Sequence, residues 1–249
     1  IYHLYLLSFA SALLISLLLT PLMRYIAVKF EIFDHPVSSV KTHKVPTPYL
    51  GGIAVWFSIV FSLIIIRFFT HFPTGTLRSL RGILFGSLLI VITGIIDDLH
   101  IKGMHFNLKF IFQFAAAAIL IYFGIKINFI TPNYIAVIFT LLWVVGITNA
   151  FNIIDVMDGL SSGLAVVASL AFLLISLPTE ELYVNFAACV LCGAAVGFMP
   201  YNLSKRFKIF LGDTGSLQIG FILSALSLGT SYTSINNIAL FAPVIILSL

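Results

Sequence analysis

Nine long runs of apolar residues follow one another along the chain, and short polar segments separate them. An α-helix that crosses a lipid bilayer needs about 20 consecutive, mainly apolar residues. The pattern therefore predicts an all-α fold, a polytopic integral membrane helix bundle with about nine transmembrane helices. The predicted spans are residues 4–23, 50–69, 79–96, 108–125, 134–151, 160–177, 183–201, 215–230 and 236–249.

The same pattern indicates one domain. No internal repeat of fixed period and no low-complexity linker divides the chain. We therefore expect residues 1–249 to form a single transmembrane domain. The last run, NIALFAPVIILSL, stops inside a span, so we also expect this domain to be truncated at its C-terminus.

Composition supports a membrane protein and excludes two other classes. Hydrophobic residues make up 60% of the chain and charged residues 9%, whereas a soluble domain carries about 25% charged residues. The net charge is +4, but no basic run contains interleaved aromatic residues, so the sequence predicts no nucleic-acid partner. Cys189 and Cys192 lie inside an apolar run without His or Cys partners nearby, which predicts buried packing and not a metal or redox site.

The distribution of basic residues predicts the orientation. Nine spans alternate the connecting loops between two sides of the membrane. The odd-numbered loops contain nine lysines and arginines and the even-numbered loops contain four. Because cytoplasmic loops carry the excess of Lys and Arg, we expect the odd-numbered loops to be cytoplasmic and the N-terminus to lie outside. The pattern thus predicts a multi-pass membrane protein.

The acidic residues are even more unevenly distributed. Seven of the nine fall on the predicted cytoplasmic side, and only Glu180 and Glu181 fall on the other. Carboxylates at span ends are costly unless they are paired, metal-bound or hydrated. The seven are Glu31, Asp34, Asp97, Asp98, Asp155, Asp158 and Asp213. Five of them lie directly at span ends, and we expect these five to form one site at the cytoplasmic membrane surface.

The segment GIIDDLH places Asp97 and Asp98 at the end of the third predicted span. Neighbouring residues on a helix point about 100° apart, so these two cannot both face one atom in the same way. We expect two roles, a metal or base position and an orienting position. The alternative is a solvated pair at a helix end, but the C-terminal end of a helix repels acids.

The segment NAFNIIDVMDGLSSG contains amides and carboxylates at intervals of three residues. Residues three apart on a helix are neighbours, although the row drifts about 60° per step. Asn149, Asn152 and Asp155 can therefore line one side of the helix over two turns. Asp158, which Gly159 follows, is expected to begin a turn. Because amides both donate and accept hydrogen bonds, the row suits contacts to a nucleotide or phosphate.

Three further segments carry candidate site residues. FLGDTGSLQIG places Asp213 before an apolar helix, where it is either a helix cap or part of a phosphate site. KTHKVPTPYLGG supplies Lys44 in a basic loop, which is either a topology determinant with lipid contacts or a phosphate anchor. Lys109 and Gln113, one helical turn apart, allow the same two interpretations.

Taken together, these residues predict a type of chemistry. Oxygen ligands without a His/Cys cluster favour Mg²⁺ or Mn²⁺ over zinc. A divalent cation with several lysines implies a phosphate-bearing substrate, and a site at the membrane surface implies a lipid-borne reactant. The combination points to phosphoryl transfer between a soluble nucleotide and a membrane lipid.

The ordered segments HKVPTPYLGG, DDLHIKGMHFNLKFIFQ, NAFNIIDVMDGLSSG and KIFLGDTGSLQIG resemble the polyprenyl-phosphate N-acetylhexosamine-1-phosphate transferases. They extend over residues 43–220. The resemblance implies transfer of a sugar-1-phosphate from a UDP-sugar to undecaprenyl phosphate, with release of UMP and with Mg²⁺ as cofactor. It also implies that a homodimer is possible.

The resemblance also implies roles for matching residues. Asp213, in the G-D-x-G-S motif, would be the principal Mg²⁺ ligand, with Mn²⁺ as the alternative cation. Asp97 would be the base or activator for the lipid phosphate, with Asp98 beside it. Asn152 and Asp155 would hold the diphosphate and the surroundings of the metal.

Five other residues complete the predicted site. Lys44 and Lys109 would neutralise phosphate charge. Asp158 belongs with the catalytic acids, and Asn149 and Asn202 are expected to bind substrate. Two mechanisms stay open, a covalent intermediate on an aspartate and direct attack by the lipid phosphate. We favour direct attack because an ionised phosphate is already a nucleophile.

The chain departs from the family pattern at Val156, where the family usually has glycine. A β-branched residue disfavours a left-handed turn at this position. The chain also stops before the His-rich loop that contributes to sugar recognition in the family, so the fragment is not expected to be fully competent. The short segment from Asp98 to Lys109 favours the UDP-GlcNAc branch over the muramoyl-pentapeptide branch.

A membrane transporter is the alternative from a different class. Intramembrane acids form proton or ion relays in transporters, which often contain inverted repeats and bind substrate near the bilayer midplane. Here the acids gather at span ends on one side and no repeat is found. Both features favour the transferase.

Overall fold

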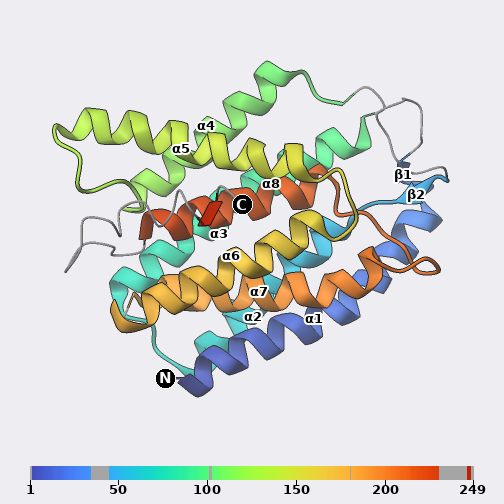
Figure 1. Cartoon of the computed structure of the whole chain (residues 1–249), viewed down its shortest axis with the longest axis horizontal. Helices are drawn as coiled ribbons and strands as arrows, with labels where there is room; N and C mark the ends of the chain where they lie inside the picture. The colour runs from blue at the N-terminus through green and yellow to red at the C-terminus, as the bar shows by residue number, and fades with distance from the viewer. Residues whose placement is uncertain (1, 35–44, 101–102, 180, 230–245, 248–249) are drawn as a thin grey trace.

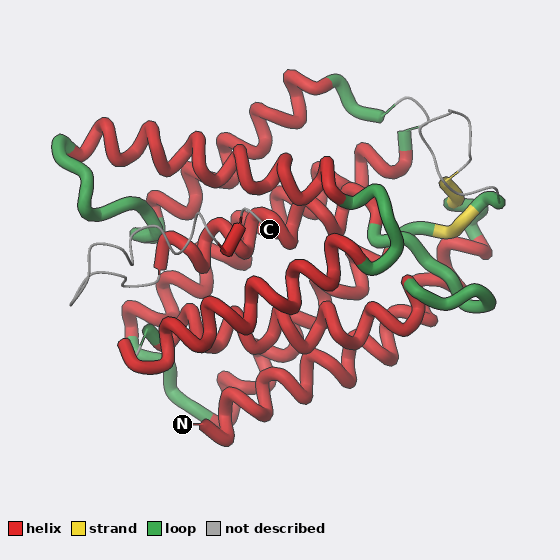
Figure 2. The backbone as a smooth tube through the Cα atoms, in the orientation of Figure 1, coloured by secondary structure: helices red, strands yellow, loops and turns green. Residues whose placement is uncertain are grey.

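The described residues form a bundle of eight α-helices, shown in Figure 1. The structure is a computed structural model that describes residues 2–34, 45–100, 103–179, 181–229 and 246–247. Figure 2 shows that the helices dominate and that the strands are confined to one end. The predicted all-α membrane bundle is confirmed. The helices are α1 (Tyr2–Lys29), α2 (Gly51–Phe69), α3 (Thr74–Leu99), α4 (Phe106–Tyr122), α5 (Asn133–Ile154), α6 (Leu160–Ser176), α7 (Leu182–Asn202) and α8 (Gly212–Gly229).

Each of the first eight predicted spans coincides with one of these helices. Five of them, α1, α2, α3, α5 and α7, are long and apolar enough to cross a membrane, and α4 and α6 are apolar but shorter. The largest difference is in α1, which continues to Lys29 beyond the apolar run that ended at residue 23. The ninth predicted span lies outside the described residues except for 246–247.

Helices α7 and α8 form the centre of the bundle. In α7, 78% of the most apolar window is buried, and α8 is buried along nearly its whole length. Close packing of α7 depends on Gly193 and Gly197, because an added Cβ would lie 2.3 Å from the carbonyl oxygen of Phe9 and 2.6 Å from that of Leu13 on α1. Small residues at such contacts let membrane helices approach closely.

The outer faces of the helices are strongly apolar. Leu6, Leu14 and Leu18 on α1 are more than half exposed, as are Phe85 on α3 and Leu142 on α5. A soluble monomer rarely exposes contiguous apolar surface of this extent, but lipid tails can cover it. Both cysteines are free and buried in α7, which confirms that they contribute to packing.

A small strand pair closes one end of the bundle. After α1 the chain turns at Glu31 and forms β1 (Phe33–Asp34), which pairs antiparallel with β2 (Thr47–Pro48). The backbone N–H groups of Gly51 and Gly52 then donate to the carbonyls of Phe210 and Leu211. The first turn of α2 is thereby joined to the segment that leads into α8.

Two glycines provide the space for the first turn of α8. A Cβ on Gly52 of α2 would lie 2.2 Å from the backbone nitrogen of Gly215, and a Cβ on Gly94 of α3 would lie 2.4 Å from Cα of Thr214. No side chain fits at either position without displacing α8. The start of α8, and with it Asp213, is therefore fixed between α2 and α3.

Candidate active site

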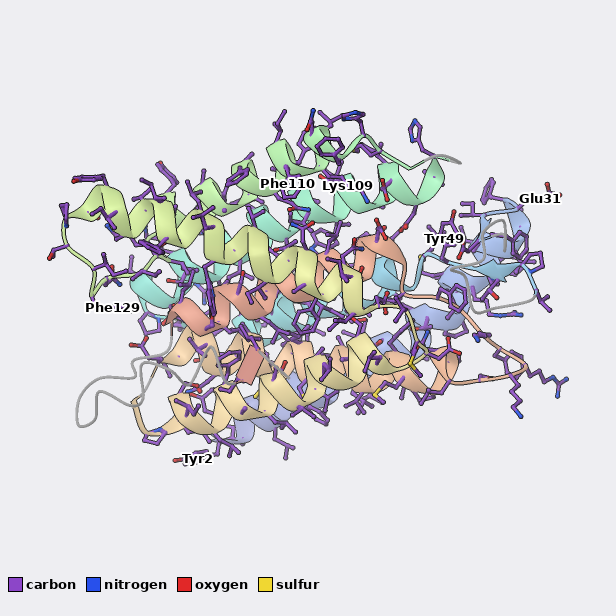
Figure 3. The ribbon with its side chains drawn as sticks, turned by 45° about the horizontal axis from the view of Figure 1, so that its top comes forward. Tyr2, Glu31, Tyr49, Lys109, Phe110 and Phe129 are labelled. Atoms are coloured by element: carbon purple, nitrogen blue, oxygen red, sulfur yellow. The ribbon has the colours of Figure 1, made fainter. Side chains whose placement is uncertain are left out.

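A cavity of about 980 Å³ opens where α3 and α5 end and α8 begins. Its wall contains all seven carboxylates that the sequence placed on one side: Glu31, Asp34, Asp97, Asp98, Asp155, Asp158 and Asp213. Figure 3 shows Glu31, Tyr49 and Lys109 toward this end of the molecule, and Phe129 and Tyr2 toward the other. The structure thus gathers acids from the end of α3, the start of α8 and the segments that follow α1 and α5 around one space.

Asp98 holds the start of α8. Its Oδ1 accepts a hydrogen bond from the backbone N–H of Asp213 at 2.9 Å. Its Oδ2 accepts two more from Thr214, at 3.1 Å from the backbone N–H and at 2.6 Å from the side-chain hydroxyl. The first N–H groups of a helix have no partner within the helix. The carboxylate of Asp98 accepts hydrogen bonds from them, and its negative charge interacts favourably with the positive end of the helix dipole. Asp98 therefore has an orienting geometry.

Asp97 faces a different partner, as the 100° offset between helix neighbours predicts. Its Oδ2 lies 2.6 Å from Nζ of Lys109, and the same nitrogen lies 2.6 Å from Oδ2 of Asp213. The other oxygen of Asp97 accepts a hydrogen bond from the backbone N–H of Met104. Lys109 thus bridges two carboxylates that come from α3 and α8.

The polar end of α5 contributes Asn152 and Asp155. The Asn152 amide donates to Oδ1 of Asp213 at 2.9 Å and to the hydroxyl of Ser216 at 3.0 Å. Asp155 follows the last residue of α5 and lines the cavity. Burial, together with the charges of Asp213, Asp98 and Asp158, raises the pKa of the Asp155 carboxyl to about 7.

Asn149 departs from the predicted row, because it is outside the cavity lining. Its amide donates to the Gln113 side chain at 2.5 Å and receives a 3.3 Å hydrogen bond in return. The drift of a three-residue row around the helix turns Asn149 away from Asp155 and toward α4. Gln113 is 1% exposed, so the pair joins α4 to α5 inside the bundle. Of the predicted row Asn149, Asn152 and Asp155, only Asn152 and Asp155 line the cavity.

The turn between α5 and α6 is held by two polar contacts. Asp158 forms a 2.6 Å ion pair with Lys208, and both side chains are partly exposed. The side chain of Asn202 accepts a hydrogen bond from the N–H of Gly159 at 2.6 Å and donates to the carbonyl of Ile209 at 3.0 Å. Asn202 borders the cavity and also fixes the loop that leads to α8.

Val156 does not strain this turn. The left-handed residue is Gly159, with φ of 75°, and among the described residues only Glu31 and Leu50 adopt positive φ without being glycine. Valine therefore occupies the position of the family glycine in an ordinary conformation. It is 59% exposed and lines the cavity.

Sequence reasoning missed Tyr49. Its hydroxyl donates to the backbone carbonyl of Asp98, and burial together with the nearby acids raises its pKa to about 12. The signal was its position beside the Gly-Gly pair that enters α2. Thr214 and Ser216 were within a quoted motif but had no role assigned. Lys44 lies outside the described residues.

The donor set fits a hard divalent cation only in part. Within the described residues no group of three or more His, Cys, Asp or Glu side chains is arranged to hold a metal. Mg²⁺, however, is usually bound by one or two carboxylates together with waters and substrate phosphates. Asp97 and Asp213, which turn one oxygen each toward the same ammonium, provide such a pair.

The site is thus a cavity rich in carboxylates at one end of a membrane helix bundle. The chain belongs to glycosyl transferase family 4, whose model matches residues 80–231. That range extends from within α3 to the end of α8 and contains nine of the ten predicted site residues, all except Lys44.

Known relatives agree with this membership. The chain is 32% identical to a probable undecaprenyl-phosphate N-acetylglucosaminyl 1-phosphate transferase of Bacillus subtilis, over 96% of this chain and 67% of that protein. It is 29% identical to the phospho-N-acetylmuramoyl-pentapeptide-transferase of Staphylococcus haemolyticus, over 87% of this chain and 74% of that protein. It is also 29% identical to the decaprenyl-phosphate N-acetylglucosaminephosphotransferase of Mycolicibacterium smegmatis, over 87% and 58% respectively.

Proposed function

We propose that this protein transfers N-acetylglucosamine-1-phosphate from UDP-GlcNAc to undecaprenyl phosphate or a related polyprenyl phosphate. The products are the lipid-diphosphate-GlcNAc and UMP. The observation that carries the proposal is the cavity at the end of the membrane helices, which acids of α3, α8 and the turn after α5 line and where Lys109 pairs with Asp97 and Asp213. The names of the Bacillus subtilis and Mycolicibacterium smegmatis relatives supply the sugar and the type of lipid.

The reaction needs little covalent chemistry from the protein. An oxygen of the lipid phosphate forms a bond to the phosphorus that carries the sugar, and the bond from that phosphorus to the bridging oxygen of UMP breaks. Phosphoryl transfer of this kind depends on positioning and charge neutralisation. A bound Mg²⁺ or Mn²⁺ ion would supply part of that neutralisation, with Asp213 as its principal ligand.

The remaining residues have positions that suit distinct tasks. Asp97 borders the cavity and can orient the lipid phosphate or accept its proton. Asn152 holds Asp213 in place, and Asp155 and Asp158 border the space that the diphosphate would occupy. Lys109, which pairs with Asp97 and Asp213, and Lys208, which borders the cavity, are the cations that phosphate oxygens could contact.

The site lies on the cytoplasmic side of a bacterial inner membrane in this proposal, with the N-terminus outside. The support is the excess of basic residues in the loops on the side of the site. UDP-sugars are soluble cytoplasmic donors, which agrees with that placement. We also expect a homodimer, which size analysis of the detergent-solubilised protein would test.

The second candidate is transfer of phospho-N-acetylmuramoyl-pentapeptide, which the Staphylococcus haemolyticus relative performs according to its name. The short segment between Asp98 and Lys109 and the sequence PTPYLGG argue against it. The two candidates differ in the donor and share the lipid acceptor, the cation and the release of UMP.

The test uses the full-length parent protein in detergent with undecaprenyl phosphate and Mg²⁺. UMP release is measured with UDP-GlcNAc, UDP-MurNAc-pentapeptide and UDP-GalNAc in parallel, and Asp213→Asn is the control. We expect release from UDP-GlcNAc that requires lipid, metal and Asp213. Release from another donor alone would correct the sugar, and no release from any donor by folded protein would refute the transferase.

A further inference from the structure

We propose that the ammonium of Lys109 is the resident cation of the site in the substrate-free protein, and that a divalent metal ion must displace it from between Asp97 and Asp213. The inference deepens the proposed function, because it concerns the cation that the proposed reaction uses. It assigns Lys109 a role before substrate binds, in addition to any contact with phosphate afterwards.

The first support is the geometry of the bridge. Nζ of Lys109 lies 2.6 Å from one oxygen of each carboxylate. Two oxygens that share one nitrogen at this distance lie no further apart than about twice that distance, so they face one small space. The three side chains are only 10% to 29% exposed, so little solvent screens the charges.

The second support is that both carboxylates are held in this orientation by their other oxygens. Oδ1 of Asp97 accepts the N–H of Met104, and Oδ1 of Asp213 accepts the amide of Asn152 at 2.9 Å. One oxygen of each acid thus has a fixed partner, and the second is left for a cation. The pair is a preformed two-carboxylate position that a lysine fills.

Competition follows from charge and space. Two anionic oxygens that share a single positive charge attract a divalent ion more strongly than they attract an ammonium. A metal ion and the ammonium cannot both lie between them, so Lys109 must lower the metal affinity of the free protein. Displacement also releases Lys109 beside the cavity, where phosphate oxygens offer it a new partner.

This exchange couples the two ligands of the site. Metal binding makes Lys109 available to a diphosphate, and a diphosphate that binds Lys109 makes the carboxylate pair available to metal. By thermodynamic linkage, each ligand then raises the affinity for the other by the same factor. We therefore expect weak metal binding alone and tighter binding with the nucleotide sugar.

The chain offers a matched control. Lys208 also forms a 2.6 Å ion pair with an acid of the cavity wall, Asp158. It contacts one carboxylate where Lys109 contacts two, and the side chains of Lys208 and Asp158 are both more exposed than those of the Lys109 bridge. Removal of Lys208 therefore changes the charge of the same cavity equally without opening the position between Asp97 and Asp213.

The experiment measures Mn²⁺ binding to full-length protein in lipid nanodiscs without substrate, by electron paramagnetic resonance of the free ion. We expect Lys109→Met to bind Mn²⁺ at least about tenfold more tightly than wild type, a factor within the usual range of coupling between sites. Lys208→Met should change the affinity by less than about threefold. Lys109→Arg retains the charge and should resemble wild type.

Unchanged or weaker Mn²⁺ binding by Lys109→Met would overturn the inference, as would an equal gain in Lys208→Met. If Lys109→Met cannot be isolated in folded form, the test is Mn²⁺ binding by the wild type with and without UDP-GlcNAc. Mn²⁺ affinity that does not rise with UDP-GlcNAc would then overturn the inference. Failure of the UMP assay with a gain of Mn²⁺ affinity in Lys109→Met would refute the transferase and leave the cation exchange in place.

Discussion

Asp97 and Asp98 are adjacent in sequence and carry the same functional group, but they have different tasks in the structure. Asp98 accepts three hydrogen bonds from the first turn of α8, whereas Asp97 faces Lys109. Helix geometry predicted that their roles differ but could not assign them, and only the family resemblance gave Asp97 the role of base or activator. That assignment depends on where α8 begins relative to the end of α3.

Loss of activity would not distinguish Asp97 from Asp98, because both belong to the candidate site. A loss of stability would distinguish them. Asp98→Ala leaves the first N–H groups of α8 without a partner, and we expect a loss of about 2 kcal/mol in the free energy of unfolding. Asp97→Ala leaves Lys109 paired with Asp213 and should lose less than Asp98→Ala, because burial of the Asp97 charge already costs free energy. Melting temperatures of the two variants in the same detergent test this order, and equal losses would contradict the capping role of Asp98.

Asp155 makes a pH dependence predictable. Its pKa rises from 3.8 to about 7 in the folded protein, so between these values the folded state binds more protons than the unfolded state. Without metal, the melting temperature should therefore fall as pH rises from about 5 to about 7 and then level off. Asp155→Asn should flatten this slope, and an unchanged slope in the variant would assign the effect to other groups.

At the scale of the helices, the decisive contacts are those that the sequence could least predict. Apolar runs predicted eight helices with small errors at their ends, because span length follows from the bilayer. Which helices adjoin cannot be derived from such runs, since every outer face is similarly apolar. For this reason the pairing of Asn149 with Gln113 was missed, and Asn149 was expected at the site.

The close packing of the start of α8 between α2 and α3 gives a prediction at this scale. In Gly94→Ala the new methyl group would lie 2.4 Å from Cα of Thr214, so α8 must shift, and we expect a loss of about 1–3 kcal/mol in stability together with most of the activity. Gly146→Ala on α5 is the matched control, because nothing lies within 4 Å of its added Cβ. A melting temperature unchanged in Gly94→Ala would show that α8 tolerates displacement.

At the scale of the whole molecule, the helices alternate in direction, so the loop after α4 and the loop after α7 lie at opposite ends of the bundle, as Figure 1 shows. Seven of the nine acidic residues line the cavity at one end of the bundle, which explains why the distribution of acids along the sequence could predict a single site. The cavity itself could not be derived, because its shape depends on β1, β2 and the turn after α5.

Orientation in the membrane is testable with single cysteines. Phe129→Cys lies in the loop after α4 and Lys205→Cys in the loop after α7, and both positions are exposed. In spheroplasts, a membrane-impermeant maleimide should label Phe129→Cys and label Lys205→Cys only after lysis. The native cysteines are buried and give little background. The reverse labelling pattern would place the site outside.

The hydrogen bonds from Gly51 and Gly52 to Phe210 and Leu211 have a consequence for how this fold can be divided. The family match begins at residue 80, within α3, and leaves out the first two helices. This could suggest that α1 and α2 are dispensable. Yet the backbone that brings Asp213 into place is tied to the start of α2. The region that the family model matches therefore depends on α2 for its structure. A fragment that begins at residue 80 would retain the acids of the cavity but would lose the contacts that hold Asp213 in position.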